Sequence, residues 1–109
     1  MATAFKILGQ VNPSATTASD LYTVGAGKET VVSTITVCNQ GSSSGTYRIA
    51  VRENGDTLAT KHYIFYDVDL AAKATDTHTL GLTLNASDII TIYASTANFS
   101  FNAYGSEKS

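Results

Sequence analysis

The sequence predicts an all-β domain, built either as an antiparallel β-sandwich or as a jelly-roll-like barrel of seven or eight strands. Three observations lead to this prediction. Apolar and polar residues alternate with a period of two along most of the chain, and turn-forming residues recur every 8 to 12 positions. No segment keeps a helical period of 3.6 over three turns, so no helix is available to connect parallel strands, and antiparallel pairing is expected. A chain of 109 residues suits one domain with one core, and we assign residues 1–109 to it.

The expected strands follow one another between clear breakers. The chain turns at Asn12-Pro13, since proline cannot donate to a ladder, and at Asn54-Gly55, a strong hairpin signal. The polar residues 105–109 are expected to form a flexible tail. The eight segments are Phe5–Val11, Leu21–Val24, Thr30–Asn39, Thr46–Glu53, His62–Val68, Thr77–Leu84, Ile89–Ser95 and Asn98–Tyr104.

Alternation also predicts which side chains face the core. In the third segment we place Val31 on the same face as Ile35 and Val37. The fourth segment alternates most clearly. Its expected inward residues are Tyr47, Ile49 and Val51, and its expected outward residues are Arg48, Ala50 and Arg52.

The composition favours a protein that packs against other molecules. Hydrophobic residues make up 43% of the chain, which is ample for a core. Charged residues make up 15%, well below the roughly 25% of an average soluble domain. Serine and threonine fill about a quarter of the positions instead. A neutral, threonine-rich exterior is typical of proteins that assemble side by side, because charge would repel identical copies.

Charge and hydropathy argue against two classes of partner. The net charge is −2 and basic residues do not cluster, so binding to nucleic acid through its phosphates is not expected. No apolar run approaches 18 residues and the N-terminus lacks a signal-peptide pattern, so we expect neither membrane insertion nor export by the usual route. Synthesis in the cytoplasm is the expectation.

A search for chemistry finds no catalytic constellation. Gly25-Ala26-Gly27-Lys28 lacks the Ser or Thr that completes a phosphate-binding loop, because Glu29 follows the lysine. The single cysteine, Cys38, reads as a small buried hydrophobe. No serine lies in a Gly-x-Ser-x-Gly elbow. We therefore expect no enzyme, no metal and no cofactor.

Two histidines leave one alternative open. His62 and His78 each have an acid nearby, and with Asp67 or Asp69 they could form a metal site if the strands converged. Asp67 and Asp69 also give a weak calcium signal. A structural or interface role for both histidines is the favoured interpretation.

The segment His62-Tyr63-Ile64-Phe65-Tyr66 carries large side chains on both faces of one strand, more than a sandwich can bury internally. We expect Tyr63 and Phe65 to point inward, because histidine is the costliest of the five to bury. The other face is expected to meet a partner, and we predict a homo-oligomer, a trimer, whose contacts include His62–Tyr66, with two further tyrosines extending the surface. The predicted interface residues are His62, Ile64, Tyr66, Tyr93 and Tyr104.

The succession of segments resembles small structural proteins of tailed bacteriophages, those infecting cyanobacteria in particular. The segments that carry this resemblance are Phe5–Gln10, Asp20–Val24, Val32–Asn39, Tyr47–Arg52 and Phe99–Glu107. The resemblance implies a virion component: a capsid cement or decoration protein, or an accessory piece of tail or fibre. It implies trimers or larger rings, with the major capsid protein or another virion protein as partner.

Two functions from different classes follow as hypotheses. The first is a structural assembly protein that binds the capsid lattice. The second is a receptor- or carbohydrate-binding module of a tail or fibre, since the chain has six tyrosines, although no tryptophan, to serve as stacking platforms.

Overall fold

The computed structural model describes residues 2–109 and confirms an all-β sandwich of eight antiparallel strands. Two short 3-10 turns, η1 (Glu53–Gly55) and η2 (Thr60–His62), interrupt the connection between the fourth and fifth strands. The strands are β1 (Thr3–Val11), β2 (Ser19–Thr23), β3 (Glu29–Asn39), β4 (Gly45–Arg52), β5 (Tyr63–Leu70), β6 (Thr75–Leu84), β7 (Ile89–Ala94) and β8 (Phe99–Lys108).

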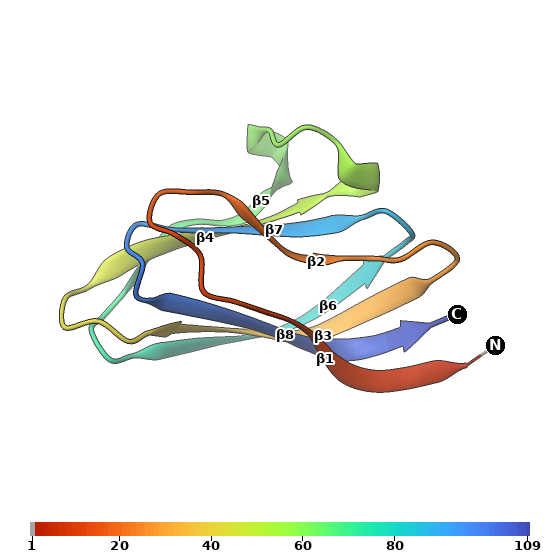
Figure 1. The fold of residues 1–109 in the computed structure, drawn as a ribbon, viewed down its shortest axis with the longest axis horizontal. Coiled ribbons are helices and arrows are strands. Elements are labelled where there is room, and N and C mark those ends of the chain that lie inside the picture. The colour runs from red at the N-terminus through yellow and green to blue at the C-terminus, as the bar shows by residue number, and fades with distance from the viewer. Residues whose placement is uncertain (1) are drawn as a thin grey trace.

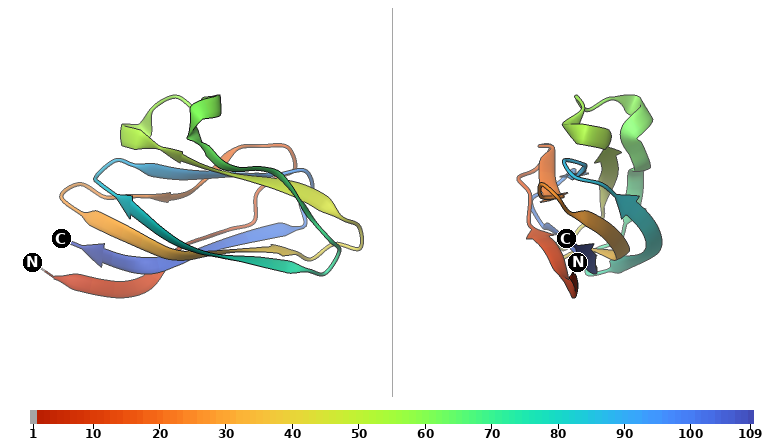
Figure 2. Two further views of the ribbon diagram at one scale, coloured as in Figure 1. Left: turned by 180° about the vertical axis from the view of Figure 1, so that it is seen from behind. Right: turned by 90° about the vertical axis from the view of Figure 1, so that its right-hand side faces the viewer.

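The strands form two four-stranded sheets that lie as two layers (Figure 1). One sheet has the order β1-β8-β3-β6 and the other β2-β7-β4-β5. Early strands pair with late ones, β1 with β8, β2 with β7, β3 with β6 and β4 with β5. The chain is therefore one long hairpin whose successive pairs alternate between the layers, which is the jelly-roll arrangement. The connection that contains η1 and η2 rises above the second layer (Figure 2).

The core lies between the two sheets and draws on both of them. Tyr47 and Ile49 from β4 face Phe99 and Phe101 from β8, and all four are fully buried. The ring centroids of Tyr47 and Phe101 are 6.1 Å apart in an edge-to-face arrangement. Burying each such side chain contributes about 1.5–3 kcal/mol, so this inter-sheet cluster supplies much of the stability.

A β-bulge in β3 corrects the predicted faces of that strand. The register of β3 with both neighbours shifts between Val32 and Thr34, so the alternation slips by one residue at Ser33. Val32, with no exposed surface, therefore joins Ile35 in the core, whereas Val31 is 43% exposed. Gly105 of β8 is required beside the bulge, because a Cβ there would collide with the carbonyl oxygen of Val31.

The fourth strand follows its predicted alternation. Tyr47 and Ile49 are buried and Val51 packs against the core, as predicted. Ala50 faces outward as predicted, but it is fully buried by side chains of the neighbouring strands. Its small side chain lies in register between Thr91 of β7 and Tyr63 of β5, whose larger side chains flank it.

Residues 105–108, which were expected to belong to a polar tail, form the last part of β8. They pair with β1 on one side and with β3 on the other, from Gly105 to Lys108. The C-terminal end of the chain is thus a central strand of its sheet, and both termini lie at the same end of the molecule (Figure 1).

The bulge in β3 leads to a test with adjacent valines. Val32→Ala should lower the free energy of unfolding by about 2 kcal/mol, because it removes buried methyl groups and leaves a cavity. Val31→Ala should change it by less than about 0.5 kcal/mol, because that side chain is exposed. Chemical denaturation followed by circular dichroism measures both. A larger loss for Val31→Ala than for Val32→Ala would contradict the bulge.

Candidate interaction surfaces

A row of stacked side chains crosses the outer face of the β2-β7-β4-β5 sheet. Arg48 of β4 lies in register with Tyr93 of β7, and its guanidinium carbon is 4.3 Å from the ring centroid of Tyr93. The same carbon is 4.3 Å from the ring centroid of Tyr66 on β5. The guanidinium is thus held between two aromatic rings, an arrangement stabilised by cation–π attraction. We call Ile64, Tyr66, Arg48 and Tyr93 the tyrosine platform.

A β-bulge in β5 builds this platform. The register passes from Val68 opposite Tyr47 to Phe65 opposite Ile49, so two residues, Tyr66 and Asp67, face the single residue Arg48. Asp67 adopts a left-handed backbone conformation with φ of 49°, which is uncommon for a residue other than glycine.

The bulge also fixes the arginine. Arg48 donates from Nε to Asp67 Oδ1 at 2.6 Å and from Nη2 to Asp67 Oδ2 at 3.3 Å. This bidentate hydrogen bond from Asp67 raises the pKa of Arg48 above its usual range. The platform is therefore pre-organised, because two aromatic rings and one carboxylate hold the guanidinium.

The structure brings three of the five predicted interface residues together on the platform. Ile64 and Tyr66 are exposed, Tyr66 to 56% of its surface, and Tyr93 is half-buried. Phe65 pairs with Ile49 and packs against the core, as predicted from the alternation. The inward placement of Tyr63 is wrong, because Tyr63 pairs with the outward-facing Ala50 and its ring lies edge-on to that of Tyr66, with 5.0 Å between the centroids.

His62 does not share the outer face with Ile64 and Tyr66, and this part of the prediction is wrong. It lies in η2 rather than in a strand and is only 7% exposed. Its Nδ1 accepts a hydrogen bond from the Ala59 N–H at 2.9 Å, and its Nε2 lies 3.5 Å from Asp56 Oδ2. Burial is tolerated because both ring nitrogens have partners.

Tyr104 lies on the other sheet and belongs to a second apolar surface. There, Phe5 and Ile7 of β1, Tyr104 of β8 and Val31 of β3 share the outer face in adjacent registers. Phe5 is 87% exposed. We call these four residues the β1 patch. The sequence did contain its signal, because Phe5-Lys6-Ile7-Leu8 carries apolar residues on both faces of a strand, as His62–Tyr66 does.

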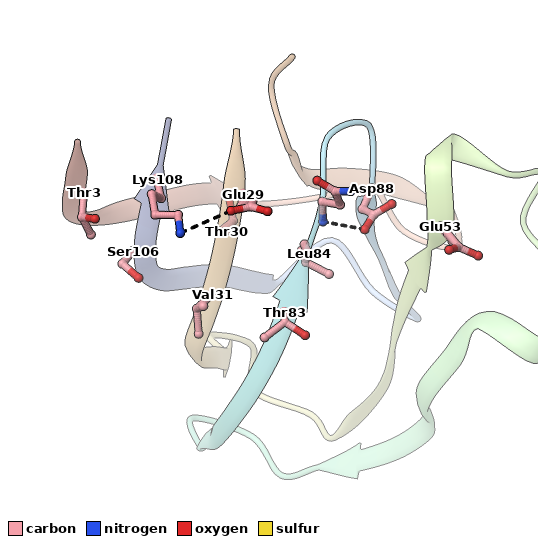
Figure 3. Close-up of a pocket in the computed structure, with 11 residues that line it drawn as sticks. Thr3, Glu29, Thr30, Val31, Glu53, Thr83, Leu84, Asp88, Ser106 and Lys108 are labelled. Atoms are coloured by element: carbon pink, nitrogen blue, oxygen red, sulfur yellow. Dashed lines mark hydrogen bonds and ion pairs between the residues drawn. The ribbon is translucent and has the colours of Figure 1, made fainter. Parts of the chain in front are cut away.

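A groove of about 590 Å³ adjoins the β1 patch (Figure 3). Val31, Thr83 and Ser106 lie along one part of it, and Glu53 and Asp88 stand at the far end. The carboxylate of Asp88 is engaged by the chain itself, since it accepts hydrogen bonds from the N–H groups of Asn54 and Asn85, both at 2.8 Å.

The groove continues into the β1 patch. A second hollow of about 460 Å³ shares Val31 and Ser106 with it and is lined by Phe5 and Tyr104. The outer face of this sheet is therefore concave where it is most apolar, which is a favourable shape for a partner.

His78 closes the open side of the sandwich between β5 and β6. The Tyr47 hydroxyl donates to Asp76 Oδ2 at 2.8 Å and lies 2.6 Å from His78 Nε2. The His78 ring stacks on Phe65 with 4.0 Å between centroids. Burial and the Asp76 carboxylate raise the pKa of Tyr47 above its usual range. These contacts give His78 a structural role.

The metal alternative gains no support from the geometry. His62 contacts Asp56, whereas His78 contacts the Tyr47 hydroxyl, and Asp67 is engaged by Arg48. Within the part of the chain that the structure describes, no three His, Cys, Asp or Glu side chains gather in a group that could hold a metal ion. Nor is any helix among residues 2–109 long and apolar enough to cross a membrane.

Two comparisons of this chain with known proteins found no match. No protein-family model matches the chain, and no curated protein matches it.

A charged cluster ties β1 and β2 to the end of β8. Glu107 Oε2 accepts a hydrogen bond from the Tyr22 hydroxyl at 2.6 Å, and Oε1 lies 3.0 Å from Lys6 Nζ and 3.7 Å from Lys28 Nζ. Burial and Glu107 raise the pKa of Tyr22 to about 12. The hydrogen bonds from Tyr22 and Lys6 lower the pKa of Glu107. The ionised carboxylate therefore stabilises this end of the sandwich.

Glu107→Gln tests that role through pH. A carboxyl whose pKa is lowered by folding stabilises the protein above its unfolded pKa, about 4.3, and this contribution is lost as the pH falls through the folded value. At pH 7 the variant should melt below the wild type, and the difference should shrink as the pH is lowered through 4.3. Tyr22→Phe should show part of the same change. A melting difference that stays constant from pH 7 to pH 3 would contradict this role for Glu107.

Proposed function

We propose that this chain is a structural assembly protein of a virion of the tailed-bacteriophage type, acting as a capsid cement or decoration protein. The observation that supports this most is the presence of two apolar surfaces, the tyrosine platform and the β1 patch, on the outer faces of opposite sheets. A small domain with a single sandwich core has no internal need for either. Two such surfaces suit a protein that contacts two neighbours at once.

The exposed apolar residues are few and clustered. Among residues 2–109, the large apolar side chains left exposed are Phe5, Ile7, Val31, Ile64 and Tyr66, and each belongs to one of the two surfaces. Burying one of them against a partner contributes about 1.5–3 kcal/mol, and repeated copies multiply the gain in a lattice. Tyrosine and arginine, which form the platform, are also the residues that contribute most to protein–protein binding.

The charges near these surfaces favour close packing of copies. Arg48 pairs with Asp67 on the platform, and Lys6 pairs with Glu107 beside the β1 patch. Each surface is therefore close to neutral, so identical copies can approach without strong repulsion.

A second candidate function, carbohydrate or receptor binding, is supported by the exposure of Tyr66. Its ring offers an open face for stacking, and Asp67, which is half-exposed, and Arg48 supply polar groups beside it. An aromatic face with a few convergent polar groups is a common arrangement for a small polar ligand.

Analysis of the particle tests the proposed function. Virions of the phage that encodes this chain are purified and their proteins identified by mass spectrometry, and cryo-electron microscopy then locates the domain. We expect many copies on the capsid lattice. Absence of the chain from purified virions would contradict the proposal. A position at a fibre tip, together with glycan-array binding that Tyr66→Ala abolishes, would favour the second candidate.

Tyr66→Ala tests the platform itself. The side chain is exposed, so the variant should fold with a melting temperature close to that of the wild type. Its binding to particles that lack the protein should fall at least tenfold, because the stack on Arg48 is lost. Thr77→Ala, an exposed position on β6, is the matched control and should bind like the wild type. Equal binding by both variants would exclude the platform as a contact.

A further inference from the structure

The edge strands of the sandwich differ in how they are protected. Strand β2 has five residues, and β5 carries the bulge together with two exposed aspartates. Strand β6 presents threonines and a glycine to solvent. Strand β1 differs, because its segment Thr3–Ile7 exposes Phe5 and Ile7 and carries one charge, on Lys6. A long apolar edge of this kind is a template for pairing with another strand.

The backbone of β1 shows which groups face that free edge. The Ser109 N–H donates to the Ala2 carbonyl at 3.0 Å, so the backbone groups of Ala2 point toward β8. Successive residues of an antiparallel strand turn their backbone groups to alternate sides. The register of β1 with β8 is unbroken from Thr3 to Ile7, so the N–H and C=O groups of Thr3, Phe5 and Ile7 point outward from the sheet.

We propose that the segment Thr3–Ile7 pairs antiparallel with the same segment of a second copy, about a two-fold axis at Phe5. Phe5 then faces Phe5 of the other copy, Thr3 faces Ile7, and Ala4 faces Lys6. The three outward-facing residues are hydrogen-bonded pairs in this register, each exchanging two bonds with its opposite residue. The two β1-β8-β3-β6 sheets become one continuous sheet, and the side chains of Phe5 and Ile7 from both copies cover one another on its outer face.

The charge of Lys6 favours this register over one that is centred on the next residue. A pairing centred on Lys6 would place two ammonium groups directly opposite each other, which is destabilising. Centring on Phe5 sets each Lys6 opposite Ala4 and leaves it beside its own Glu107, at 3.0 Å. The inference rests on the proposed assembly function for its biological purpose, whereas the contact is defined by β1 alone.

Disulfide trapping tests the register with Cys38→Ser as background. The Ala4→Cys and Lys6→Cys proteins are prepared separately, so that Phe5 and Ile7 stay intact. When mixed under mild oxidation, they should form a 4–6 disulfide heterodimer, because the opposed Cα atoms of a non-hydrogen-bonded pair are about 4.5 Å apart. Each protein alone should cross-link poorly, since like positions are then diagonal and about 7–8 Å apart. Self-cross-linking of Lys6→Cys in preference to the mixture would overturn the register.

Light scattering across a concentration series tests the pairing. The wild type should dimerise, and Phe5→Asp should raise the dissociation constant at least tenfold without unfolding the domain, because Phe5 is 87% exposed. Tyr66→Asp, on the opposite sheet, is the matched control and should leave the dimer intact. A wild type that is monomeric at 100 µM would overturn the pairing while leaving particle binding as a separate result. An oligomer unaffected by Phe5→Asp would overturn the pairing but not the assembly function.

Discussion

Each strand of this sandwich must keep its apolar side chains on the inner face while its sheet twists, and a strict two-residue alternation cannot do both everywhere. Register shifts in β1, β3 and β5 resolve the conflict. In β3 the shift brings Val32 into the core and leaves Val31 outside. In β5 the extra residue places Tyr66 and Asp67 together over Arg48. The same device thus completes the core on one strand and builds a surface on another.

Tyr47 links the core to the open side of the sandwich. Its ring packs between Phe99 and Phe101, and its hydroxyl reaches Asp76 and His78 on the edge strand β6. A buried hydroxyl without partners would cost roughly 1–3 kcal/mol, so this end of the ring requires the two polar groups of β6. The contact holds β6 against β4 across the gap between the sheets, where backbone hydrogen bonds cannot reach.

The sequence predicts where the strands lie, but it does not predict for every strand which side chains face the core. Eight strands and the breaks between them follow from period and turn chemistry, because these signals are local. The exposure of Val31 could not be predicted, because the bulge depends on the close approach of Gly105 from a strand over seventy residues away. The placement of His62 also differs from the prediction. Alternation predicts that the fifth strand begins at His62, whereas this residue lies in η2, where a hydrogen bond from the Ala59 N–H makes burial of the ring possible. The apolar residues on both faces of Phe5–Leu8 are visible in the sequence, but the position of this strand at the edge of its sheet is a property of topology, which a two-residue period does not reveal.

Topology also determines how the two surfaces are oriented in an assembly. An antiparallel pair of edge strands is related by an axis perpendicular to the sheet, so each face of the sheet continues as the same face in the second copy. Pairing through β1 would therefore place both β2-β7-β4-β5 sheets on one side, with their tyrosine platforms facing in the same direction. A partner lattice would then meet two identical platforms at a fixed spacing. Two weak contacts made together bind far more tightly than either alone, because the second is formed at high effective concentration. Modest apolar surfaces on a domain of this size would then be sufficient for stable attachment.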